Sequence, residues 1–149
     1  QKTARSFFLM ARYGRIMAIE NQRWYRIQMD VVGGKFYLET DLFDEATGEA
    51  QRLPTSDFYC KPVQMTGDVK FEDVQISPLT SEYQNTDSEH DDQQSIAFLP
   101  NGTAQAAVVQ IGDGKTHYTI SINPGTGRTK LIEGTSENVV IGIIDLDQQ

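Results

Sequence analysis

The sequence predicts an α+β fold, in which one N-terminal helix packs on antiparallel β-sheet. Residues 2–22 have the apolar spacing of a helix, and the rest of the chain changes to short segments that alternate with period two between Gly, Pro and Asn. The chain has 149 residues, which is the length of one domain. We therefore expect a single domain over residues 1–149, with the helix in residues 1–22 and a β-rich head in residues 23–149.

The expected helix has two apolar sides. The first is a stripe of small residues together with one ring, namely Ala4, Phe7, Ala11, Gly14 and Ala18. The second is an apolar line on the other side, formed by Leu9, Tyr13 and Ile16. Arg5 and Arg12 lie between them, and their stems could cover Leu9 and Ile16. The small stripe is expected to face the chain's own sheet, whereas the second line either faces a neighbouring subunit or belongs to a deeply buried helix.

The strands are expected to begin with a hairpin of residues 24–30 and 35–40, joined through Val31, Val32 and two glycines. Residues 41–62 are mixed and polar and contain Pro54 and Pro62, so they predict a loop with at most a short strand. Residues 77–94 hold five acids and no Lys or Arg, which predicts a surface loop. The remaining expected strands are 68–76, 95–99, 104–111, 117–122, 128–132 and 138–145.

The segment "NPGTGR" near the end of the chain raises the question of a phosphate-binding loop. Such a loop needs a helix after it, so that amide groups and the helix dipole converge on the anion. The residues after Gly127 are β-like. The segment therefore predicts a turn, with Gly125 and Gly127 supplying positive φ.

The charge distribution excludes a generally basic nucleic-acid binder. The net charge is −8 and the isoelectric point is near 4.6. Residues 1–30 nevertheless carry six Lys/Arg against two acids, whereas the rest carries seven against nineteen. This asymmetry suggests that the two parts face different surroundings.

No set of residues predicts catalysis. The candidate general bases are His90, in the acidic loop, and His117, at the start of a strand where a surface side chain is expected. Cys60 has no reactive motif around it and is expected to be structural. The acidic loop offers a weak Ca²⁺ site, with Asp87, Glu89, Asp91 and Asp92 as its carboxylates. A solvated charge run explains these acids better, and no cofactor is expected.

The order of the motifs resembles that of the GspH/FimT-type minor pseudopilins of bacterial type II secretion and type IV pilus systems. The motifs that carry the resemblance are Ala11-Arg12 with Ala18 in the helix, the hairpin of residues 24–39, the turn at 98–102 and the turn at 126–128. The resemblance implies a pilin-like fold, truncated before its N-terminal membrane helix. Residues 1–22 would then be the C-terminal half of the pilin helix.

The resemblance also implies a non-catalytic assembly role. It suggests a periplasmic domain anchored in the inner membrane by an apolar segment upstream of Gln1. The expected partners are the other pseudopilins of the same system and, at the loops, secreted cargo, with no nucleic acid. The stripe of small residues would pack on the chain's own sheet, and Leu9, Tyr13 and Ile16 would face neighbouring subunits.

Two alternatives remain open from the sequence. One is a FimT-like minor pilin of a type IV pilus, some of whose relatives receive DNA. The other is a secreted β-rich module that binds a small ligand on an aromatic face, for which the candidates are Trp24, Tyr25 and Tyr37.

Overall fold

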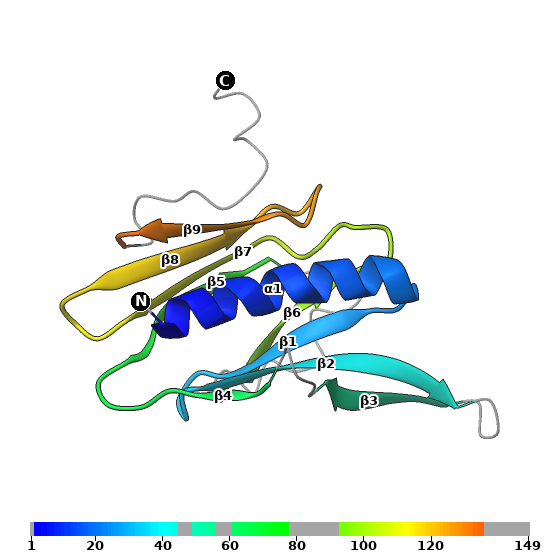
Figure 1. The fold of residues 1–149 in the computed structure, drawn as a ribbon, viewed down its shortest axis with the longest axis horizontal. Coiled ribbons are helices and arrows are strands. Elements are labelled where there is room, and N and C mark those ends of the chain that lie inside the picture. The colour runs from blue at the N-terminus through cyan, green and yellow to red at the C-terminus, as the bar shows by residue number, and fades with distance from the viewer. Residues whose placement is uncertain (1, 45–48, 56–60, 78–92, 136–149) are drawn as a thin grey trace.

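The computed structural model describes residues 2–44, 49–55, 61–77 and 93–135. The helix α1 (Lys2–Asn21) comes first and is followed in these ranges by strands only. The strands form two antiparallel sheets, and α1 packs against strands of both (Figure 1). This is the predicted α+β architecture with the helix on antiparallel sheet.

The first sheet has the strand order β3-β2-β1-β6, with the short β4 also paired to β2. The bounds of its strands are Tyr25–Asp30 for β1, Lys35–Asp44 for β2, Glu49–Thr55 for β3, Val63–Gln64 for β4 and Gln93–Phe98 for β6. The predicted hairpin is present as β1 and β2, which pair from Tyr25↔Thr40 to Asp30↔Lys35. Alternate residues of β1 are buried, as expected for a sheet with one face toward the helix.

The second sheet has the order β5-β7-β8-β9. Its strands are Lys70–Ile76 for β5, Ala107–Gly112 for β7, His117–Ile122 for β8 and Thr129–Glu133 for β9. The strand β5 carries a bulge between Phe71 and Asp73, where its register on β7 shifts by one residue. Every residue of β7 is buried, so β7 lies at the centre of this part of the molecule.

Three aromatic rings join the helix to both sheets. Phe7 of α1 packs edge-on against Phe36 of β2 and Phe71 of β5, with ring centroids 5.0 and 6.2 Å away. Phe36 and Phe71 also contact each other at 6.1 Å. Such edge-to-face pairs add to the free energy gained by burying the rings. The core is therefore continuous from one sheet to the other beneath α1.

The expectation of a loop over residues 41–62 is wrong for much of its length. The strand β2 continues to Asp44, and β3 pairs with it from Leu38↔Thr55 to Asp44↔Glu49. Pro54 is compatible with β3 because this strand is at the edge of the sheet, where a missing N–H breaks no ladder. Of the expected loop 77–94, residues 78–92 lie outside the described residues, whereas Gln93 and Gln94 belong to β6. The expected strand 138–145 also lies outside the described residues.

Candidate assembly surface

The helix α1 presents its small residues to the sheets. Ala4, Ala11 and Ala18 are fully buried, and Gly14 is buried with them. A Cβ atom on Gly14 would lie 3.1 Å from a methyl of Leu38. The small residues along this side therefore allow the helix to approach the first sheet closely.

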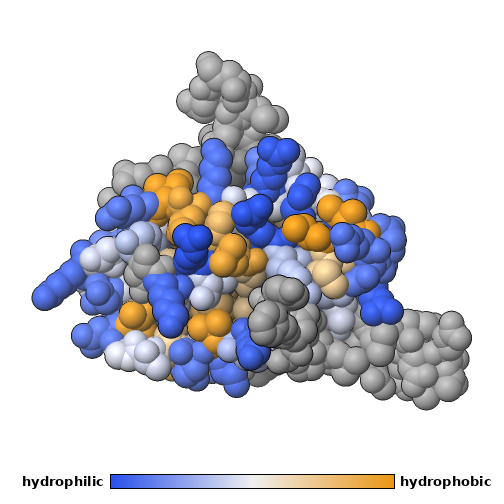
Figure 2. Space-filling view, in the orientation of Figure 1, coloured by the Kyte–Doolittle hydropathy of each residue, from blue (hydrophilic) through white to orange (hydrophobic). Residues whose placement is uncertain are grey.

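The opposite side of α1 carries large apolar side chains in solvent. Leu9 is 47% exposed, Ile16 43% and Ile19 37%. Tyr13 is only half-buried and packs against the edge of the core. The view onto α1 shows apolar residues in small groups between hydrophilic ones (Figure 2). The side of α1 turned away from the sheets therefore carries three partly exposed large apolar side chains.

The end of α1 is fixed by a left-handed residue. Gln22 has φ 54°, and the amide of Arg23 donates to the carbonyl of Ala18 at 3.2 Å. This is the hydrogen bond of a Schellman cap, with Gln22 in the position that Gly usually takes. The Gln22 side chain also donates to the Ile19 carbonyl at 2.7 Å. The cap sets the point where the chain leaves the helix for β1.

Two distant turns meet at the C-terminal half of α1. The first turn contains Gly102 and the second contains Gly127, and the amide of Ala104 donates to the carbonyl of Pro124 at 3.1 Å between them. The guanidinium Nε of Arg15 donates to the carbonyl of Thr126 at 2.7 Å. The motifs at 98–102 and 126–128 thus lie together in space and hold the helix in place.

The segment "NPGTGR" is a turn, as predicted, but only one of its glycines needs positive φ. Gly127 has φ 70°, whereas Gly125 is not among the described residues with positive φ. The carboxamide oxygen of Asn123 accepts from the amides of Gly125 and Thr126 at 2.9 and 3.2 Å. Because the Asn side chain closes the start of the turn, Gly125 keeps an ordinary backbone conformation.

A polar cluster lies at the bulge of β5, where sequence analysis predicted only a surface histidine. Nδ1 of His117 lies 2.7 Å from Oε1 of Glu72, and Gln110 Nε2 donates to the same oxygen at 2.6 Å. The amide of Gly114 donates to the other carboxylate oxygen at 3.2 Å. Burial raises the pKa of Glu72, but the hydrogen bonds from Gln110, His117 and Gly114 outweigh it, so that this pKa lies below its ordinary value.

This cluster ties three strands together. Glu72 joins β5 to the hairpin of β7 and β8, so His117 is partly buried and engaged. In the described ranges, no three His, Cys, Asp or Glu side chains lie close enough to hold a metal ion. His90, Cys60 and the Ca²⁺ candidates Asp87, Glu89, Asp91 and Asp92 all lie outside those ranges.

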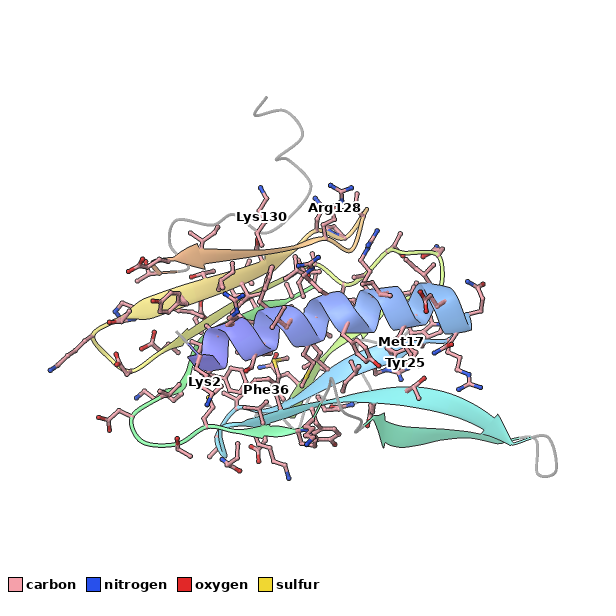
Figure 3. All side chains as sticks on the ribbon, viewed as in Figure 1. Lys2, Met17, Tyr25, Phe36, Arg128 and Lys130 are labelled. Carbon is pink, nitrogen blue, oxygen red and sulfur yellow. The ribbon has the colours of Figure 1, made fainter. Side chains whose placement is uncertain are left out.

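The proposed aromatic ligand face is not formed by its three candidates. Tyr25 is 3% exposed and points into the core, and Figure 3 shows it next to Met17 under the helix. Tyr37 pairs with Gln28, and therefore lies on the other face of the sheet. Trp24 is covered by the guanidinium of Arg26, 5.6 Å from its ring centroid. The three rings therefore do not form one open surface, because Tyr25 is buried in the core.

The described part of the chain contains no helix that combines the length and the apolar character needed to cross a bilayer. No family model and no curated protein matches the sequence. Its fold, in contrast, matches two solved structures of the minor pseudopilin EpsH from the type 2 secretion system of Vibrio cholerae, each with a TM-score of 0.62.

The first of these structures is 11% identical, over 88% of this chain and 94% of that chain. The second is a crystal structure and is 12% identical, over 90% of this chain and 94% of that chain. The match therefore runs through both sheets and the helix rather than through a single motif. The chain has the fold of a type II secretion minor pseudopilin, as the order of its motifs predicts.

Proposed function

We propose that this protein is a non-catalytic minor pseudopilin, which assembles into the periplasmic pseudopilus of a type II secretion system and helps to export folded proteins. The observation that carries the proposal is the fold shared with EpsH along nearly the whole of both chains. The exposed side of α1 supports it, because Leu9 and Ile16 are large apolar side chains with no role in the described core.

In this proposal, Leu9, Tyr13 and Ile16 face a neighbouring subunit, while Ala4, Ala11, Gly14 and Ala18 hold the helix on its own sheets. The partners are other pseudopilins of the same system and, through the loops of the head, secreted cargo. An apolar segment preceding residue 1 would anchor the protein in the inner membrane, with this domain in the periplasm. Catalysis has no part in this proposal, which rests on assembly.

The proposal is tested by secretion in the source organism. The chromosomal gene is replaced by the double variant Leu9→Glu plus Ile16→Glu, and the secreted proteins are measured in the culture medium. We expect loss of secretion with normal amounts of the variant protein in the cell, because two carboxylates would replace apolar contact. Val32→Glu is the matched control, since Val32 is 80% exposed in the turn between β1 and β2.

Secretion that persists after deletion of the whole gene would contradict the proposal. A deletion that removes twitching motility or pili and leaves secretion intact would assign the protein to a type IV pilus instead.

A further inference from the structure

The exposed side of α1 has the spacing of a helix–helix packing seam. Its members follow one another at intervals of four, three, four and three residues, namely Arg5, Leu9, Arg12, Ile16 and Ile19. This is the alternation by which one helix packs along another over several turns. The seam is unusual because two of its first three positions are arginines, and both are exposed.

The charges of this seam are not neutralised by the described part of the chain. Neither Arg5 nor Arg12 forms an ion pair there, and the Arg12 guanidinium lies 5.6 Å from the ring centroid of Phe8. The helix α1 contains a single acidic residue, Glu20, which lies near its end. A chain with net charge −8 therefore presents a positive strip at its helix.

A second copy of the same helix does not fit this seam. In a parallel pair, Arg5 would face Arg5 and Arg12 would face Arg12. In an antiparallel pair centred on the seam, Arg12 would face Arg12 and Arg5 would face Ile19. Either arrangement brings arginine against arginine without a counter-charge, which opposes self-association.

We propose that the α1 seam binds an α-helix of a different subunit, one that places carboxylates opposite Arg5 and Arg12 and apolar side chains opposite Leu9 and Ile16. This inference rests on the proposed function and adds the chemistry of the partner. Arg is suited to it because its guanidinium binds a carboxylate through two parallel hydrogen bonds. The arginines thus select an acidic partner and reject self-association, whereas Leu9 and Ile16 supply buried area.

The test uses two synthetic amphipathic peptides of about 25 residues, long enough to be helical. Both carry Leu at alternate seam positions, and the remaining seam positions are Glu in the acidic probe and Lys in the basic probe. Binding of each labelled peptide to the full chain is measured by fluorescence anisotropy at low salt and at about 0.5 M salt, where exposed charges are screened.

We expect the acidic probe to bind about tenfold more tightly at low salt, a difference of about 1.4 kcal/mol. The preference should shrink at high salt, and Arg5→Glu plus Arg12→Glu should reverse it. The charge-matched control is Lys61→Glu plus Lys115→Glu, at exposed positions away from the helix, and it should leave the preference unchanged. Circular dichroism checks that each variant is folded.

Equal binding of the two probes, or no binding of the acidic one, would overturn the inference. Binding to vesicles that contain phosphatidylglycerol, without binding to the acidic peptide, would also overturn it and assign the arginines to a lipid surface. A further outcome is secretion that stays intact in Arg5→Glu plus Arg12→Glu and is abolished in Leu9→Glu plus Ile16→Glu. That result would refute the inference of an acidic partner and leave the proposed function standing.

Discussion

Gly127 is the residue at which the two turns and the helix come together. Its φ is 70°, and a Cβ atom there would lie 2.5 Å from the carbonyl oxygen of Gly102 and 3.1 Å from Cδ of Arg15. The first of these neighbours is backbone and cannot move aside as a side chain can. Glycine is therefore required at this position by conformation and by space together.

Gly127→Ala should lower the free energy of unfolding by about 2–4 kcal/mol, because positive φ and a backbone clash act together. Gly67→Ala separates the two causes, since Gly67 has φ 66° with nothing within 4 Å of an added Cβ. We expect that control to lose only about 1–2 kcal/mol. Urea denaturation followed by circular dichroism measures the free energy of unfolding of both variants. Equal losses would show that the close approach to Gly102 does not add to the cost of the substitution.

The lowered pKa of Glu72 predicts how the stability of the fold depends on pH. Because its pKa is lowered in the folded protein, its stabilising contribution is fully present above the ordinary pKa of a glutamate, about 4.3. It is lost as the pH falls through the lowered value. Glu72→Gln should therefore reduce the loss of stability between about pH 5 and pH 3.

The charge-matched control for this experiment is Asp73→Asn, on the neighbouring position of the same strand. The amides of Thr116 and Lys115 also lower the pKa of Asp113, so part of the acid dependence should remain in Glu72→Gln. Thermal denaturation at a series of pH values measures how steeply stability falls as the pH is lowered. If this fall is as steep in Glu72→Gln as in the wild type, Glu72 does not contribute to the acid dependence.

At the scale of the elements, α1 is held through the ring of Phe7. Phe7 is fully buried and contacts one strand of each sheet through Phe36 and Phe71. Phe7→Ala should cost about 3–5 kcal/mol, the usual range for removing a core aromatic side chain. Phe8→Ala, one position away on the partly buried side, should cost clearly less. Calorimetric unfolding of both variants checks this, and similar losses would argue against the three-ring contact.

The elements that the sequence predicts best are those with a clear period. The helix was expected to end at residue 22 and ends at Asn21, and the expected strand 117–122 has the bounds of β8. The strand β3 could not be predicted, because it is polar and contains Pro54. Its pairing depends on an edge position that only the assembled sheet defines.

The polar cluster at Glu72 was missed for a related reason. His117 has the appearance of a surface residue at a strand end, and only the bulge in β5 turns Glu72 toward it. A bulge of this kind leaves no periodic signal in the sequence. The meeting of Arg15 with Thr126, separated by 111 positions, is equally a product of the tertiary fold.

At the scale of the whole molecule, the motifs predicted the fold although the overall sequence carries little similarity. The matching EpsH structures are 11–12% identical, yet both sheets and the helix correspond over about nine-tenths of each chain. We propose that the exposed side of α1 joins this protein to other subunits.

The most direct measurement of this claim is the mass of the complex in solution. The domain is mixed with the soluble domains of the other pseudopilins of the same organism and passed through size-exclusion chromatography with light scattering. We predict a hetero-complex that Leu9→Glu plus Ile16→Glu dissociates, while Val32→Glu leaves it intact. A complex of unchanged mass with the folded double variant would contradict the account, because assembly would then use another surface.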